Sequence, residues 1–172
     1  MEKHIVYIQY LRSGVSRSRD IKFRGKSIET NEWVYGFYYE IPAPLKCIGK
    51  RDEPKGYIVM ERPNTVNDWG MPIQMVSVEV DKKTVGQYIG LKDDKKQEVY
   101  EGDIILSPWW DDEPQEVVFK DYGFKGRDIR QKIIYGRELY FGIDDLLNGC
   151  FGEVFEIIGN IYDNPELLRG EW

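Results

Sequence analysis

Hydrophobic and polar residues alternate along several short segments of the chain, and this pattern predicts a β-rich protein rather than a helical one. The alternation is clearest in residues 75–80, where Val76, Val78 and Val80 fall on one side of a strand. We expect that side to face the core. Further strands are predicted at residues 4–11, 21–24, 33–41, 57–60, 84–91, 99–100, 104–106, 116–120, 132–135 and 154–162.

Residues 84–106 predict an antiparallel hairpin followed by a tight turn into a third strand. Residues 93–97 form its charged turn, and Gly102 can supply the positive φ that a type II turn requires. A second glycine, Gly36, lies inside the strand predicted at residues 33–41. It indicates a bulge or the close approach of a neighbouring backbone.

Helices are expected to be few and short. Residues 143–147, followed by Gly149, predict one helix with a left-handed C-terminal cap. Asn164 and Pro165 predict the cap and the first position of a single helical turn that ends at Leu168. Many short strands joined by turns, including a turn-rich segment at residues 122–128, predict a mainly β fold, namely a small barrel or roll.

The polar, turn-rich segment at residues 62–72 is a candidate boundary within the chain. It would separate an N-terminal β lobe, residues 21–62, from a second lobe, residues 75–168. A long surface loop costs little entropy, so a single domain with a long loop is the alternative.

Charge is distributed unevenly over the 172 residues. The net charge is −6, but residues 1–30 carry +4 and the remaining residues carry −10. The molecule as a whole should repel phosphate backbones, so only the basic N-terminal arm favours an anionic partner. Its candidate nucleic-acid contacts are Arg17, Arg19, Lys22 and Arg24, and the alternative is a terminal tail of solvated charges.

The residue types that most catalytic and metal sites require are scarce. His4 is the only histidine, and Cys47 and Cys150 are the only cysteines. We therefore expect neither a nucleophile activated by an internal histidine nor a tetrahedral zinc site. We predict two reduced thiols and no cofactor, since the glycine-rich motifs that bind nucleotide phosphates are missing from the sequence.

The acidic run of Asp111, Asp112 and Glu113 could supply oxygen ligands to Mg²⁺ or Ca²⁺. Neighbouring acids on one turn point in different directions, however, and most such runs are simply solvated. We therefore expect no metal site, and a metal-dependent enzyme is the weakest of the functional hypotheses.

The same loop carries two adjacent tryptophans, Trp109 and Trp110, followed by Asp111 and Asp112. Two indoles beside acidic groups could stack on a base or a sugar, or enter an apolar pocket of a partner. These four residues form the candidate partner surface. The alternative places one tryptophan in the core and the other over the mouth of the barrel.

The sequence contains no apolar run long enough to cross a membrane. Residues 5–11 are too short for a signal peptide and have no small-residue cleavage site after them. We expect a soluble, cytoplasmic protein without a membrane partner.

Three segments of the chain resemble the YopX family of bacteriophage and prophage proteins. They are IKFRGKSIETNEWVYGFYYE at residues 21–40, VDKKTVGQYIGLKDDKKQEVYEGDIIL at residues 80–106 and EIIGNIYDNPELL at residues 156–168. The resemblance implies a phage or prophage origin in a bacterial host and a β-rich fold with a roll or SH3-like barrel. It implies no biochemical activity and supplies no catalytic residues. Because the family tends to begin near Ile21, residues 1–20 are an N-terminal extension.

The hypothesis that fits these observations is a non-enzymatic accessory protein that binds another protein or a second copy of itself. Exposed aromatic residues and edge strands would supply the contact surface. The alternative is a nucleic-acid-binding protein that uses the basic arm.

Overall fold

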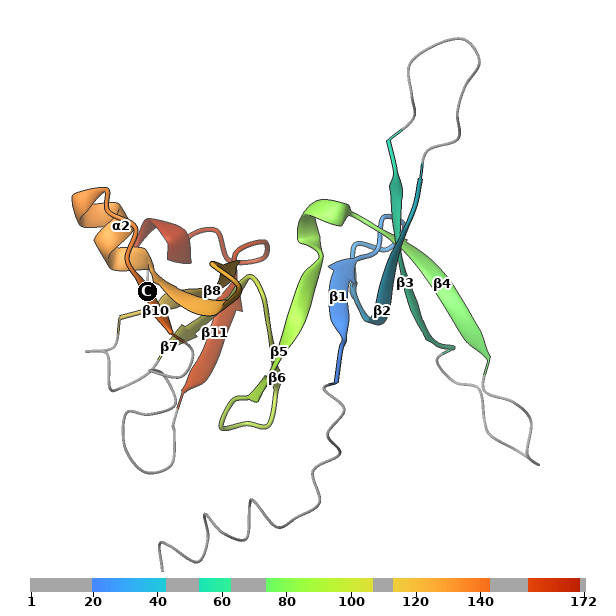
Figure 1. Cartoon of the computed structure of the whole chain (residues 1–172), viewed down its shortest axis with the longest axis horizontal. Helices are drawn as coiled ribbons and strands as arrows, with labels where there is room; N and C mark the ends of the chain where they lie inside the picture. Colours follow the sequence, from blue (N-terminus) through green and yellow to red (C-terminus); the bar gives the residue numbers. More distant parts are fainter. Residues whose placement is uncertain (1–19, 43–52, 63–73, 107–112, 143–154, 171–172) are drawn as a thin grey trace, which may run out of the picture.

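The computed structural model describes residues 20–42, 53–62, 74–106, 113–142 and 155–170, which form two antiparallel β-sheets (Figure 1). The predicted mainly β fold is therefore confirmed. The first sheet, ordered β4-β3-β2-β1-β5-β6, contains β1 (Phe23–Lys26), β2 (Trp33–Ile41), β3 (Lys55–Glu61), β4 (Met75–Val80), β5 (Gly86–Lys92) and β6 (Glu98–Tyr100). The second, ordered β10-β9-β8-β7-β11, contains β7 (Asp103–Leu106), β8 (Gln115–Lys120), β9 (Gly123–Asp128), β10 (Tyr140–Gly142) and β11 (Glu156–Asn160).

The first four strands curl into an open roll. The end of β4 returns to the end of β1, where Ser27 and Val80 form a single β-bridge and the Asp81 N–H donates to the Lys26 carbonyl at 2.9 Å. Ile58 and Val80 are buried inside this roll. Among the described residues neither sheet closes into a barrel, so the barrel and its SH3-like character remain predictions.

A second core lies where the two sheets meet. One buried cluster contains residues from both sheets: Val99, Ile105, Val117 and Phe155. Val99 lies on β6 of the first sheet, whereas Ile105 and Val117 lie on β7 and β8 of the second. Burying a side chain of this size contributes about 1.5–3 kcal/mol. The cluster therefore ties the edge of the first sheet to the second, and β5 and β6 lie between the two halves in Figure 1.

The predicted hairpin and tight turn at residues 84–106 are confirmed. β5 pairs with β6, and Gly102 has a φ of 85° in the turn that leads into β7. The sequence does not show that β7 leaves the first sheet and pairs with β8 and β11 in the second. The close approach predicted at Gly36 is also confirmed, because a Cβ there would clash with the Val59 carbonyl oxygen on β3.

The strand predicted at residues 132–135 is wrong, because a helix, α2 (Ile129–Tyr135), occupies this part of the chain. Its N-cap is Asp128, whose side chain accepts the Gln131 N–H at 2.8 Å, and it ends at Gly136 in the left-handed conformation. These caps outweigh the β-branched residues of the segment. The turn-rich segment predicted at residues 122–128 is wrong beyond Tyr122, since Gly123–Asp128 forms β9.

The C-terminal turn also differs in detail from the prediction. The Asn164 side chain accepts the N–H of Asn160 at 3.3 Å rather than capping a following helix. A 3₁₀ turn, η4 (Leu167–Arg169), begins three residues later, with Glu166 at its N-cap. A second 3₁₀ turn, η2 (Lys82–Thr84), connects β4 to β5.

The predicted boundary segment and three further predictions fall mainly on residues outside the described ranges. The segment at residues 62–72, considered as a boundary, joins β3 and β4, which pair in one sheet from Gly56 and Val80 to Glu61 and Met75. The strand predicted at residues 4–11, the helix predicted at residues 143–147 and both cysteines lie outside the described residues.

Candidate functional site

The three segments that resemble one family meet at the junction between the sheets. Arg24 of β1 forms a buried ion pair with Asp103 of β7, with 2.6 Å between Nη1 and Oδ1. The Arg24 guanidinium lies over the rings of Trp33 and Tyr100, 4.6 and 5.2 Å from their centroids. Burial raises the pKa of Asp103, while Arg24 and the Tyr100 N–H oppose that shift.

Asp163, in the C-terminal turn, makes a second connection across the junction. It pairs with Lys26 of β1, and it accepts hydrogen bonds from Trp33 Nε1 at 2.7 Å and from Asn160 Nδ2 at 2.9 Å. Burial opposes ionisation, but the three donors prevail and lower the pKa of Asp163 to about 2. The carboxylate is therefore charged throughout the physiological pH range.

Tyr162 anchors the same turn on the first sheet. Its hydroxyl donates to the Lys83 carbonyl at 2.6 Å, and its ring packs against that of Trp33 with 5.8 Å between centroids. The Asn160 side chain holds the turn itself by accepting the N–H groups of Tyr162 and Asp163. These residues therefore have a structural role, because their polar groups are used to hold the two sheets together.

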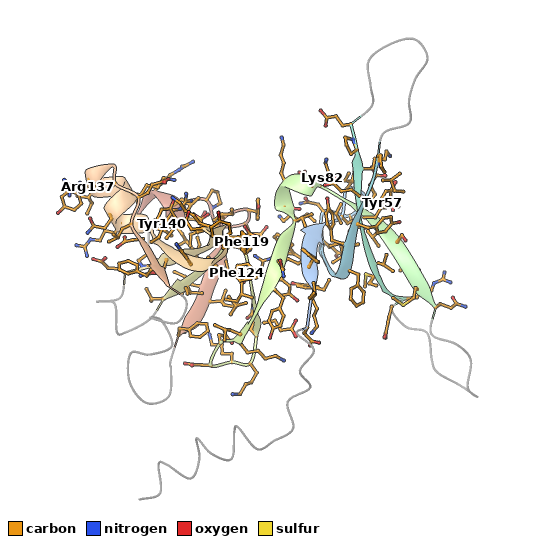
Figure 2. The ribbon with its side chains drawn as sticks, viewed as in Figure 1. Tyr57, Lys82, Phe119, Phe124, Arg137 and Tyr140 are labelled. Carbon is orange, nitrogen blue, oxygen red and sulfur yellow. The ribbon has the colours of Figure 1, made fainter. Side chains whose placement is uncertain are left out.

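A row of exposed aromatic side chains begins beside this junction and follows β2 outward. Tyr35, Phe37 and Tyr39 alternate along one face of the strand, and Phe37 is 63% exposed. On β3, Val59 lies opposite Phe37, and Tyr57 lies opposite Tyr39 with the two rings stacked 5.4 Å apart. We call this surface the aromatic face; it comprises Tyr35, Phe37, Tyr39, Tyr57, Val59 and Met75, of which Figure 2 labels Tyr57.

The aromatic face contains a pocket of about 310 Å³ with a mainly apolar lining. Tyr35 and Phe37 contribute from β2, and Val59 and Met75 contribute from β3 and β4. Tyr100 of β6 lines the end next to the junction, where its ring lies 5.5 Å from that of Tyr35. The remaining lining residues are Lys22, Gly36, Met60, Glu61 and Glu98.

Some of the charged groups that line this pocket form ion pairs, and one does not within the described residues. Lys22 Nζ lies 2.8 Å from Glu98 and 3.6 Å from Asp20, so its charge is neutralised locally. The bond from Lys22 lowers the pKa of Glu98, and the same bond raises the pKa of Lys22. Tyr100 also donates to Glu98, at 2.7 Å. Glu61 is exposed and has no ion-pair partner among the described residues.

Charges on the second sheet neutralise one another. Arg127 pairs with Glu116, and the Tyr140 hydroxyl donates to Glu138 at 2.6 Å. Lys120 lies over the Tyr140 ring, 3.7 Å from its centroid, and Figure 2 labels Tyr140 at this position. Within the described part of the chain, no three histidine, cysteine or acidic side chains gather as metal ligands would.

Most of the residues predicted as functional from sequence lie outside the part of the chain that the structure describes. Trp109, Trp110, Asp111 and Asp112 lie outside the described residues, as do Arg17 and Arg19. The acidic neighbour Glu113 pairs with Arg130 at 2.7 Å.

Two of the predicted nucleic-acid contacts, Lys22 and Arg24, lie in the described part of the chain, and both are paired with acids. Arg24 is only 5% exposed and pairs with Asp103, and Lys22 pairs with Glu98. Neither cation offers a free charge to a phosphate. The prediction of nucleic-acid contacts at Arg17 and Arg19 stays a prediction.

Sequence reasoning missed the aromatic face, although its residues belong to a strand predicted with the right bounds. In β2, Tyr35, Phe37 and Tyr39 share one side, but Tyr38 and Val34 occupy the other. Both sides are apolar, so alternation alone does not distinguish the core side from the exposed side.

The chain belongs to the YopX family, because the sequence profile of the family, described as YopX protein, matches residues 22–169. Among solved structures, the chain is similar to the crystal structure of protein EF1440 from Enterococcus faecalis. The two are 20% identical, the match covers 88% of this chain and 99% of the other, and the TM-score is 0.43. No curated protein matches the chain. In the described part of the chain, no helix has the length and apolar character needed to span a membrane.

Proposed function

We propose that this protein is a non-enzymatic binding module whose aromatic face docks another protein chain. The observation that carries the proposal is the row of exposed aromatic residues Tyr35, Phe37 and Tyr39 around an apolar pocket. Exposed apolar patches of this kind mark interaction surfaces, and large aromatic side chains dominate the energy of protein interfaces.

The charges around the aromatic face favour a protein partner over a nucleic acid. Lys55 and Glu79 pair with each other at 2.9 Å, and Glu61 has no ion-pair partner within the described ranges. Aromatic platforms that stack nucleic-acid bases also need a positive groove that follows the phosphates. The described charges do not supply one here.

The polar groups of the pocket support a binding role rather than proton-transfer chemistry. A general acid or base works best when its pKa lies near the working pH. The hydrogen bond from Lys22 shifts the pKa of Glu98 downward, away from that range. Burial and the bond to Glu98 shift the pKa of Tyr100 upward, also away from it.

The setting of this function also belongs to the proposal. Membership of the YopX family supports a phage or prophage accessory protein that acts in the cytoplasm of a bacterial host. The partner is either a different protein or a second copy of this chain.

Site-specific photocrosslinking tests the proposal. Benzoylphenylalanine replaces Phe37 in the aromatic face or, as a matched control, the fully exposed Tyr122 in the turn between β8 and β9. Irradiation of cells that produce the protein should yield a defined protein adduct from position 37 and not from position 122. The same adducts from both positions, or no protein adduct from position 37, would contradict a docking role for this face.

A further inference from the structure

We infer that the occupant of the aromatic face is a second copy of this chain, which inserts the segment around α2 in a head-to-tail contact. The inference rests on the proposed function, since it names the partner of the same face.

The pocket fits one large apolar side chain rather than an extended ligand. At about 310 Å³ it lies at the low end of the range for ligand pockets. Its walls come mainly from Tyr35, Phe37, Val59, Met60 and Met75. In an interface of this kind, one large apolar side chain of the partner fills the pocket at the centre. The polar groups around the pocket then determine orientation and specificity.

The chain itself exposes suitable anchors on α2. Ile133, Ile134 and Tyr135 are 43%, 54% and 63% exposed, and Leu139 just beyond the helix is 44% exposed. By contrast Ile129, at the start of the same helix, is buried. From Lys132 onward every residue of the helix is exposed, so these apolar side chains have no partner within the described residues.

Charge complementarity links the two surfaces. Lys132 and Arg137 flank the exposed residues of α2, and no ion pair engages either of them among the described residues. The aromatic face offers the opposite charge at Glu61, which is likewise unpaired there. An apolar anchor with basic neighbours thus matches an apolar pocket with an acidic rim.

The positions of the two surfaces determine the type of assembly. The strands of the aromatic face and α2 lie at opposite ends of the molecule in Figure 1, and Arg137 and Tyr57 mark these ends in Figure 2. A contact between two different patches cannot be isologous. Copies would therefore add head to tail and form open chains or rings, rather than stopping at a two-fold dimer.

Two complementary variants test this arrangement without any unknown partner. Phe37→Ser disables the aromatic face and keeps α2, whereas Ile134→Ser disables α2 and keeps the aromatic face; both side chains are more than half exposed. Light scattering on the full chain should show concentration-dependent association of wild type. Each variant alone should associate about 30-fold more weakly, as expected for the loss of an interface hot spot.

An equimolar mixture of the two variants gives the decisive result. One intact face and one intact helix remain between them, so the mixture should reach the mass of two chains and no more. A wild type that stays monomeric at every concentration, a mixture that stays monomeric, or an Ile134→Ser variant that still dimerises would overturn the inference. A foreign protein crosslinked from position 37 of a monomeric wild type would overturn it too, but would leave the proposed function standing.

Charge reversal provides a second, independent test. Glu61→Lys should weaken association about fivefold, the upper range for an exposed ion pair, and Arg137→Glu in the same chain should restore it. Glu29→Lys changes the net charge equally at an exposed site in the turn after β1, outside the pocket lining, and serves as the control. Equal weakening by Glu61→Lys and Glu29→Lys would contradict a role for the acidic rim.

Discussion

Arg24 and Asp103 form a buried ion pair that joins the two sheets, with 2.6 Å between Nη1 of the one and Oδ1 of the other. Their side chains are only 6% and 2% exposed. Such a pair contributes little compared with apolar packing, but the loss of one partner leaves an uncompensated buried charge.

Arg24→Met should therefore lower the free energy of unfolding by about 3–5 kcal/mol, measured by urea denaturation. The matched control is Arg130→Met, which removes a half-exposed partner of Glu113 and should cost at most about 1 kcal/mol. If the two variants lost equal stability, the loss of Arg24 would not leave Asp103 as an uncompensated buried charge.

Asp163 makes stability depend on acid pH. Its pKa is about 2 in the folded protein and 3.8 as the ordinary value, so the folded state favours the ionised form. This contribution is fully present above pH about 4 and is lost as the pH falls through about 2. The free energy of unfolding is measured by urea titration at pH values from about 4 down to about 2. Over this range it should fall less for Asp163→Asn than for wild type. Parallel pH profiles would show that Lys26 and Trp33 do not stabilise the carboxylate.

Gly36 should not tolerate a side chain. A Cβ at this position would clash with the Val59 backbone, so Gly36→Ala should destabilise the protein by about 1–3 kcal/mol. Gly123→Ala is the matched control, because Gly123 is also a strand glycine and its Cβ would meet no neighbour within 4 Å. Thermal unfolding of both variants gives the comparison, and equal melting temperatures would refute the close approach of β2 and β3.

The N-cap of α2 gives a further prediction. Asp128→Ala removes the acceptor for the Gln131 N–H and should cost about 1 kcal/mol, whereas Asp128→Asn keeps an acceptor and should cost less. Chemical denaturation of the two variants measures the difference. A larger loss for the asparagine variant would show that the charge, and not the cap, stabilises this position.

Local patterns predicted the elements whose residues interact mainly with near neighbours in sequence. The alternation in β4 and the run of aromatic and β-branched residues in β2 predict the bounds of these strands, and Gly102 marks the turn before β7. Where two local signals compete, the weaker one misleads: the β-branched residues at 133 and 134 suggested a strand, but the caps at Asp128 and Gly136 make a helix. For this segment the capping residues predict the helix better than the strand preference of the residues between them does.

The junction and the aromatic face depend on contacts between distant segments, and a single sequence does not specify those. Nothing local indicates that Arg24 should meet Asp103, or that Asp163 should meet Lys26 and Trp33. The sequence alone therefore places Arg24 in an exposed basic arm, whereas in the structure it is 5% exposed and pairs with Asp103.

The binding role of the aromatic face is tested most directly by measuring both crosslinking and stability in one variant. Benzoylphenylalanine at Tyr39 reports on the aromatic face, and Phe37→Ser is introduced into the same chain. Because Phe37 is 63% exposed, the free energy of unfolding should change by no more than about 0.5 kcal/mol, while the protein adduct from position 39 should disappear. An adduct that persists at full yield would contradict a binding role for the aromatic face.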